Sequence, residues 1–498
     1  MFLANDHEVV SKEPEIMIIR QSRTIALAVI AIGGATVSGA AEVSASELGV
    51  DQERDALSQL AELQKVVESQ SREIAAMKQE NGQNWLTEER ASEIRGVVQD
   101  VLVDAESRTT FQDSGATAGW NKGFFLASPD GNFKLKISGQ VQLRYVVNHA
   151  NGYTSAQPGD KAPYLWGFEN RRTKLKFSGH MFDPSWTYSV KGAFTREKAG
   201  TLLLEDAWIA KSLGEGWKVK VGQFKAPWLR EELVSSSRQL AVERSIVNEY
   251  FNQGYSQGIE LSYATDDFKV SGWTGDGIGA RGLGPARSNS QNTPWNQTST
   301  SYSFVARGEW KMAGEWSQFK DFSSRRGSAF AAMAGISGVI QRANQNIGPN
   351  NGTVSSGVTG DLTLDFNGAS IYVSGIWTNV VPPKGQGRRT NNPFGVTVQG
   401  GYFVSEDVEV FGRYEYMSYD YDGLTNSDSV GRFDGLTLGA NWFFNSAVKL
   451  TLDWTINFAS LDNSSLNSAF VSNSAGFRPD KPGETHQWAL RAQLQLLF

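Results

Sequence analysis

Basic side chains recur at alternate positions of the segment Phe133–Val147. Lys134, Lys136 and Arg144 alternate there with apolar residues. A period of two places the basic side chains on one face of a β-strand and the apolar ones on the other. Where such a basic face lines water, it raises the local concentration of anions by direct charge. The chemistry that this spacing predicts is electrostatic attraction of anions.

Residues for covalent or metal chemistry are few. The chain has no Cys, and its four His (His7, His149, His180 and His486) show no metal-like clustering. An outer-membrane hydrolase would need His180 or His486 beside a serine and an orienting Asn or Asp. His180 adjoins a predicted short turn and His486 begins the last predicted strand, so neither favours an enzyme. We expect no enzyme activity and no cofactor.

The end of the chain predicts a membrane wall. In His486–Phe498, the residues Trp488, Leu490 and Leu494 alternate with Gln and Arg. One face of such a strand suits lipid and the other suits water, although this segment alone would also fit a soluble sandwich.

Sixteen segments of this kind are predicted, an even number that would close a bacterial barrel around an aqueous channel. They are Phe133–Val147, Arg172–Met181, Trp186–Phe194, Leu202–Lys211, Lys218–Phe224, Gly258–Ala264, Phe268–Thr274, Tyr302–Lys311, Ala329–Ile340, Gly360–Asn367, Ala369–Thr378, Gly395–Phe403, Val408–Ser418, Phe433–Phe444, Val448–Phe458 and the terminal segment. The expected fold is an all-β, sixteen-stranded antiparallel transmembrane β-barrel with an N-terminal α-helical coiled-coil segment.

The composition agrees with a barrel. The 498 residues include 51 Gly, 15 Trp, 14 Tyr and 27 Phe, and the mean hydropathy is −0.36. A chain rich in aromatic residues and turns but not apolar overall excludes a bundle of membrane helices. The absence of Cys suits an envelope protein that crosses an oxidising periplasm. The net charge of −6, with no basic arm, argues against nucleic acid as a partner.

The segments before the barrel have other patterns. Residues 1–41 are expected to be a signal peptide, with Met17 as a candidate true start, because basic residues precede a short apolar run and small residues follow it. In residues 42–108, Leu60, Val67 and Ile74 recur every seven positions, which predicts a periplasmic coiled-coil stalk. A solvated helical spacer is the alternative. Residues 109–132 are expected to be a linker and 133–498 the barrel.

Links between the predicted strands alternate in length. Short links such as 183–185, 265–267, 367–368 and 405–407 fit periplasmic turns. The links 148–170, 275–301, 379–393 and 420–432 are long and polar and are expected outside the cell. Aromatic residues at strand ends, such as Trp377 and Trp488, are candidates for interfacial girdles.

The segment 225–257 runs for over thirty residues without alternation. A loop so long is functional or disordered, and its many large apolar residues argue against disorder. We expect it to fold into the barrel and to form a constriction of paired charges. These charges are Lys225, Arg230, Arg238 and Arg244 with Glu231, Glu232, Glu243 and Glu249.

The predicted pore-lining and anion-binding residues are the basic residues of this loop and of the lumen face of the early strands. They are Lys134, Lys136, Arg144, Arg172, Lys174, Lys176, Lys191, Lys218, Lys220, Lys225, Arg230, Arg238 and Arg244. Later strands carry acidic residues as well, so the alternative is that the charges balance across the lumen without selectivity.

One predicted strand, Leu202–Lys211, conflicts with strict alternation. If Leu204 and Trp208 face outward, so does Asp206, and the opposite parity turns Glu205 outward. A subunit interface tolerates such a carboxylate better than lipid does. The conflict therefore favours an oligomer.

Three motifs resemble the phosphate-selective porin O and P family. They are GQFKAPWLREEL at 222–233, ERS at 243–245 and GIELSY at 258–263, and the run GFFLASPDGNFKLKISGQVQLRY from Gly123 resembles that family's first strand. The resemblance covers about Gly123 to Phe498. It implies a trimeric sixteen-stranded channel that prefers anions, often phosphate, and guides them with arginine and lysine side chains.

We therefore predict an outer-membrane porin for passive diffusion of small hydrophilic solutes, anions in particular. The expected partners are small anionic or polar solutes, outer-membrane lipid and sister subunits of a homotrimer. One alternative is an oligosaccharide channel, in which Trp228, Tyr250, Phe251 and Tyr255 would stack against sugars. Another is a structural tether, in which the stalk holds the envelope and the barrel is only an anchor.

Overall fold

The computed structural model describes Lys65, Ser69 and residues 116–498, except 152–161, 196–199, 287–291, 345–351, 385–389, 420–430, 460–474 and 479–484. Lys65 and Ser69 are helical and exposed. The predicted signal peptide, nearly all of the predicted stalk and the first part of the predicted linker lie outside the described residues. Within the described residues, no helix is both long enough and apolar enough to cross a membrane.

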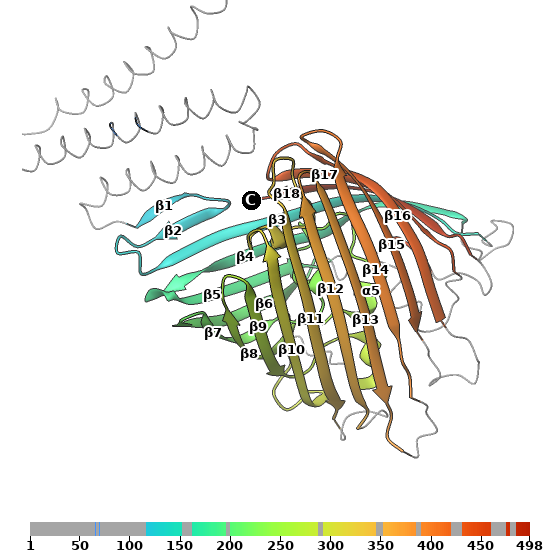
Figure 1. Ribbon diagram of the computed structural model, residues 1–498, viewed down its shortest axis with the longest axis horizontal. Coiled ribbons are helices and arrows are strands. Elements are labelled where there is room, and N and C mark those ends of the chain that lie inside the picture. Colours follow the sequence, from blue (N-terminus) through green and yellow to red (C-terminus); the bar gives the residue numbers. More distant parts are fainter. Residues whose placement is uncertain are drawn as a thin grey trace, which may run out of the picture. The chain divides into compact units, whose positions relative to one another are not determined.

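Sixteen of the strands, β3 to β18, form a closed antiparallel ring (Figure 1). Each pairs with the next along the chain, and β18 pairs back onto β3. Their bounds are β3 Lys134–His149, β4 Tyr164–Met181, β5 Asp183–Phe194, β6 Leu202–Gly214, β7 Trp217–Phe224, β8 Ser256–Ala264, β9 Phe268–Gly275, β10 Thr300–Ala313, β11 Ala331–Ala343, β12 Val354–Phe366, β13 Ala369–Val381, β14 Phe394–Phe403, β15 Val408–Tyr419, β16 Gly431–Phe443, β17 Val448–Asn457 and β18 Trp488–Leu497.

Every predicted strand overlaps one strand of this ring, so the sixteen-stranded barrel is confirmed. The largest differences are at two strand starts: β4 begins at Tyr164 rather than at Arg172, and β12 at Val354 rather than at Gly360. The predicted external link 148–170 is wrong in its last part, because Tyr164 to Asn170 pair with β3. The predicted turn 183–185 is also misplaced: these residues begin β5, and the turn is made at Phe182 with a φ of 70°.

A short hairpin, β1 (Thr117–Trp120) and β2 (Phe124–Ala127), lies within the predicted linker. β2 pairs with the first residues of β3, on the edge that β18 occupies further along. Between these two partners, Phe498 exchanges backbone hydrogen bonds with Gly139, N–O distances 2.6 and 3.1 Å. A Cβ at Gly139 would lie 2.2 Å from the Phe498 ring, so only glycine fits under the last residue.

The two faces of the wall differ in chemistry as the alternation predicts. In β18, Leu490, Leu494 and Leu496 are exposed on the outside, whereas Arg491 and Gln493 are buried on the inside. Aromatic pairs bridge adjacent strands near the short turns, as in Phe268 with Trp310 and Phe330 with Phe366. Phe394 with Tyr416 does so near the long links, where Trp488 of β18 also stacks on His149 of β3. These pairs fit two interfacial girdles.

Strict alternation in β6 would turn either Glu205 or Asp206 outward, but a β-bulge lets both face the lumen. The register between β5 and β6 shifts at Lys191, which leaves Glu205 as an extra residue between Leu204 and Asp206. A bulge lets two consecutive side chains face the same side, and both carboxylates bind Lys191 in the lumen. The sequence-based argument from these carboxylates to an oligomer is therefore wrong.

The apolar core lies inside the barrel. The loop after β7 contains α4 (Arg230–Leu233) and α5 (Ile246–Phe251), and the link after β9 contains the 3-10 turn η1 (Arg281–Ala286). Trp228, Phe251 and Leu283 from these two links are fully buried in one cluster with inward residues of the wall. This arrangement brings the loop into the lumen (Figure 1).

Candidate functional site

The loop 225–255 crosses the lumen from β7 and first contacts the wall of β10 and β11. Ser337 Oγ donates a hydrogen bond of 2.8 Å to Pro227 O, and Arg307 Nη1 donates one of 3.4 Å to Trp228 O. The Arg307 guanidinium is held by Asp361 of β12 at 2.8 and 3.0 Å. The first half of the loop is therefore fixed to the wall three and four strands away from β7.

The middle of the loop is bound by polar side chains of β16 and β17. Lys449 Nζ donates to Gln239 O at 2.9 Å, and Asn441 Nδ2 donates to Leu240 O at 3.0 Å. The Val242 N–H donates to Asp453 Oδ2 at 2.9 Å, and Asp453 also accepts two hydrogen bonds from Arg491. These backbone contacts tie the loop to the strands near the end of the chain.

A second inward segment supports the loop from the side of the short turns. Most links at that end are only a few residues long, but residues 314–330 join β10 to β11 and include the 3-10 turn η2 (Gln318–Lys320). We call this segment the strap. Phe322 of the strap is 2% exposed and packs with Val234 and Leu240 of the loop. Asp321 pairs with Arg238 at 2.8 Å, and the Phe322 N–H donates to Arg238 O at 3.2 Å.

Three arginines from β3 and β4 converge on one carboxylate of the loop. Glu243 is 1% exposed and binds Arg144, Arg171 and Arg172, the last at 2.6 Å. Burial alone would raise the pKa of Glu243, but the charges of Arg171, Arg172 and Arg144 hold it well below the usual value. We call these three arginines the arginine cradle. Glu243 remains ionised inside it at neutral pH.

A second ion-pair group lies within the loop. Glu232 pairs with Lys225, and with Arg244 at 3.2 Å. Burial would raise the pKa of Glu232, but Arg244 and Lys225 lower it to about 2. Burial lowers the pKa of Lys225 to about 8, although Glu232 opposes that effect. The loop thus keeps its own charges paired.

Lysines of the early strands face the remaining part of the lumen. Lys174 binds Glu205 at 2.6 Å, Lys191 binds Asp206 at 2.7 Å, and Lys220 binds Glu260 at 2.8 Å. Tyr255 donates its hydroxyl to Glu205 at 3.0 Å, close to Lys191. These pairs lie where the loop returns to the wall.

Other lysines of the same wall lack a carboxylate partner within 4 Å among the described residues. They are Lys134, Lys136, Lys176 and Lys218, and all are half-buried. Lys136 and Lys176 lie in adjacent strands, with Ser178 opposite Lys136 and Ser138 opposite Lys176. We call these four lysines the lysine stripe.

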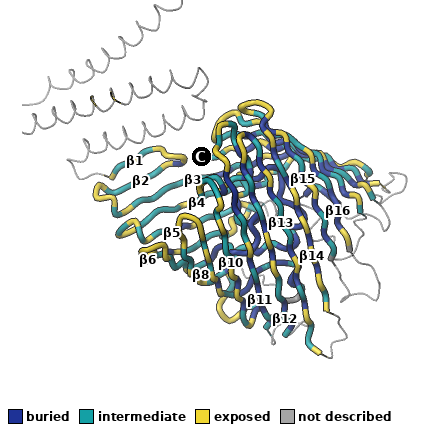
Figure 2. Tube along the Cα trace, in the orientation of Figure 1, coloured by how far each residue is buried: buried dark blue, intermediate teal, exposed yellow. Residues whose placement is uncertain are grey.

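The two sides of the lumen differ in burial. On β11 to β18, the inward polar side chains are covered by the loop, the strap and each other, whereas the lysines of β3 to β7 keep part of their surface accessible (Figure 2). Buried inward residues of the first group include Gln341, Thr359, Glu409, Arg413, Thr437, Asn441, Asp453 and Arg491. The accessible lumen therefore runs along the early strands.

The structure separates the predicted site residues into groups. Arg144 and Arg172 form ion pairs with Glu243, while Lys174, Lys191 and Lys220 pair with carboxylates of the wall. Of the loop cations, Lys225 and Arg244 pair with Glu232, Arg238 pairs with Asp321, and buried Arg230 donates to Phe319 O of the strap. The remaining four predicted site residues are the lysines of the lysine stripe.

Sequence reasoning missed Arg171 and the strap. Arg171 lies at a bulge in β4 between Asn170 and Arg172, where the register with β3 shifts. A strictly alternating strand would turn Arg171 outward. The only indication in the sequence that it faces inward is the pair of consecutive arginines, Arg171 and Arg172. The strap had a detectable signal, because 312–328 separates two predicted strands by more than a turn.

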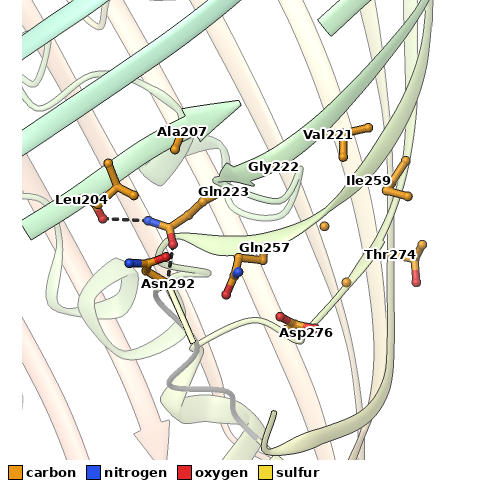
Figure 3. A pocket seen from close by; sticks show the side chains of 12 residues that line it. Leu204, Ala207, Val221, Gly222, Gln223, Gln257, Ile259, Thr274, Asp276 and Asn292 are labelled. Atoms are coloured by element: carbon orange, nitrogen blue, oxygen red, sulfur yellow. Dashed lines mark hydrogen bonds between the residues drawn. The ribbon is translucent and has the colours of Figure 1, made fainter. Parts of the chain in front are cut away.

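A pocket of about 500 Å³ lies outside the lumen, on the outer face of β6 to β9 (Figure 3). Outward-facing Val221 and Ile259 line it, together with Gln223 and Gln257. Gln223 Nε2 donates to Leu204 O at 2.7 Å, and Gln223 Oε1 accepts from the Asn292 N–H. This pocket faces away from the path of a solute, and it places two polar side chains on the outer wall.

A closed sixteen-stranded barrel with an apolar outer face, a charged lumen and an inserted loop is the architecture of an outer-membrane porin. Residues 142–310 match the family described as phosphate-selective porin O and P. This match confirms, over those residues, the resemblance seen in the sequence, and it supports an outer-membrane location. None of the curated proteins compared with the chain matches it.

Several solved outer-membrane proteins are similar to this chain at low sequence identity. The anion-selective porin from Comamonas acidovorans is 12% identical, with 73% of this chain and 99% of that chain covered and a TM-score of 0.49. OmpT of Vibrio cholerae is 11% identical, with coverage of 74% and 98% and a TM-score of 0.47. The outer-membrane channel DcaP of Acinetobacter baumannii is 10% identical, with coverage of 73% and 98% and a TM-score of 0.47.

Proposed function

We propose that this porin lets small hydrophilic anions diffuse passively across the outer membrane, along the wall of β3 to β8. The observation that carries the proposal is the asymmetry of the lumen. The loop and the strap bury the inward side chains of β11 to β18, while lysines stay accessible on the early strands. A solute that passes the loop meets a wall with more positive than negative charge.

The lysine stripe supplies the preference for anions. Lys134, Lys136, Lys176 and Lys218 have no carboxylate within 4 Å among the described residues, so each presents to the lumen an ammonium group that forms no direct ion pair there. At about 8 Å in water, one unit charge contributes about 0.5 kcal/mol, or roughly a twofold change in local anion concentration. Several such groups produce selectivity without tight binding. Inorganic phosphate and small carboxylates fit this chemistry.

Planar-bilayer recordings test the proposal. In a KCl gradient, the reversal potential of the refolded wild-type protein is expected to show anion preference. The double variant Lys136→Gln and Lys176→Gln is expected to lose most of it, because the local concentration of chloride falls roughly fourfold. Lys320→Gln, in the exposed part of the strap, serves as the matched control. Equal reversal potentials for the double variant and this control would refute the proposal.

We also propose a homotrimer. The resemblance of residues 142–310 to the phosphate-selective porin O and P family, which implies a trimeric channel, supports this proposal. Chemical crosslinking of the protein in native membranes tests this, and a monomer as the largest species would contradict it.

The oligosaccharide channel has less support. Of the four aromatic residues proposed to stack against sugars, Trp228, Tyr250 and Phe251 are at most 2% exposed inside the core cluster. Only Tyr255 is half-buried, and its ring lies near Lys191 and Lys225. The tether depends on residues outside the described part of the chain and stays a prediction.

A further inference from the structure

The three guanidinium groups of the arginine cradle all contact one carboxylate of the loop, that of Glu243. Arg144 also binds Glu169 at 3.2 Å and Gln493 at 3.2 Å, and Arg172 Nη1 donates to Gln142 Oε1 at 3.0 Å. Both oxygens of Glu243 are used: Oε1 by Arg144 and Arg171, and Oε2 by Arg172. A carboxylate bound by several guanidinium groups occupies the place that a solute oxyanion would take.

The cradle borders the accessible part of the lumen. The side chain of Arg171 keeps 15% of its surface accessible and that of Glu169 keeps 24%, whereas the side chains of Glu243 and Arg144 keep none. Glu249 of α5 lies close enough to Arg171 for their charges to interact. A small anion in the lumen can thus reach the edge of the cradle but finds its centre filled.

The backbone around Glu243 is held in place by hydrogen bonds that do not involve the Glu243 side chain. The Val242 N–H binds Asp453, and Arg413 Nη1 donates to Glu243 O at 2.8 Å. On the other side, Ser245 binds Glu231 through its N–H at 2.7 Å and its hydroxyl at 2.6 Å. The carboxylate is therefore held in the cradle by contacts that remain when its charge is removed.

We propose that Glu243 is a built-in counter-anion that keeps the arginine cradle from binding oxyanions such as phosphate or small carboxylates. Without it, three guanidinium groups at the edge of the path would retain an oxyanion by bidentate, charge-assisted hydrogen bonds. A channel conducts only if its solute leaves as readily as it enters. Glu243 thus prevents tight binding of anions by the arginine cradle. Anions in the lumen are then attracted only by the weaker lysine stripe. This inference rests on the proposed function, because it concerns the same solute path.

The experiment compares Glu243→Gln with the wild type in the full chain, and phosphate is the probe. The amide removes the charge, so phosphate is expected to bind the arginines at the accessible edge of the cradle, beside Arg171. Phosphate is expected to block the chloride current of E243Q at a concentration lower by at least about tenfold, the effect of one hydrogen bond to a charged group. E243D keeps the carboxylate and is expected to stay closer to the wild type. Glu406→Gln, in the exposed turn between β14 and β15, removes the same charge elsewhere and is expected to change nothing.

Equal phosphate block in E243Q, E406Q and the wild type would overturn the inference. If E243Q does not refold, the double variant E243Q with Arg172→Gln removes one positive charge and still leaves two arginines free for the same comparison. Calorimetric titration of phosphate into the detergent-solubilised protein separates this inference from the proposed function. Binding by E243Q and not by the wild type supports the counter-anion even if neither protein conducts, and equal binding refutes it even if both conduct.

Discussion

The two walls of this lumen both carry polar side chains but use them differently. On β11 to β18, Asp453, Asn441 and Lys449 bind the backbone of the loop and are buried. On β3 to β7, Lys136, Lys176 and their neighbours keep part of their surface accessible. One wall is thus a scaffold for the loop and the other faces the solute. The comparison teaches that an inward charge indicates a pore only when nothing in the protein has already bound it.

Removal of the loop would produce the largest change in this comparison. Replacing residues 229–252 with a short Gly-Ser linker exposes the buried side chains of β11 to β18 to water, so both walls line the channel. Conductance is expected to rise severalfold, and anion preference to persist, because the arginine cradle loses Glu243 while Asp361 and Asp453 stay paired with Arg307 and Arg491. Single-channel recordings measure both. A deletion variant that folds with unchanged conductance would show that the loop does not narrow the channel.

Phe322→Ala tests whether the strap supports the loop. The Phe322 ring is buried against loop residues and lies 4.8 Å from the ring of Tyr372. Its loss is expected to cost about 3–5 kcal/mol of packing, and to increase current fluctuations as the loop loosens. Thermal unfolding and open-channel noise measure the two effects. Phe330→Ala, at the outer end of the same strap, is the control and is expected to leave the noise unchanged.

Acid is expected to loosen the loop within a defined pH window. Because the pKa of Glu232 is lowered to about 2 in the folded protein, its ion pairs contribute their full stability above the ordinary pKa near 4.5. That contribution falls as pH drops from 4.5 towards 2, by on the order of a few kcal/mol. Unfolding measured from pH 6 to pH 2 should show this loss. Glu232→Gln should flatten the profile in that window, and an unchanged slope would contradict the assignment.

Asp321→Ala is expected to have the smallest effect. The side chains of Arg238 and Asp321 keep 49% and 26% of their surface accessible, so water and salt screen their ion pair. Such pairs contribute about 0.2–1 kcal/mol. A small rise in open-channel noise at low salt, absent at high salt, is the expected result. An effect as large as that of Phe322→Ala would mean that charge rather than packing holds the strap.

Much of the fold could be predicted because membrane strands follow a local rule. Alternation of apolar and polar residues depends only on neighbours in sequence, and it located all sixteen strands and the lumen face of residues such as Lys136 and Lys176. The inward loop was also predictable, since 225–257 is too long for a turn and too apolar for disorder. Boundaries were less predictable where strands extend past the apolar band, as in the first part of β4.

The chain alone determined the number of strands, the face on which each lysine lies and the presence of an inserted loop, because these depend on spacing along the backbone. Only the tertiary structure decided which charges remain for a solute. Glu243 meets Arg144 across 99 positions, and Gln142 meets Gln495 across 353. The bulges at Arg171 and Glu205 reversed two side chains that a period of two would turn outward. Neutralisation of a charge depends on distance in space, and no spacing in the sequence reports that distance.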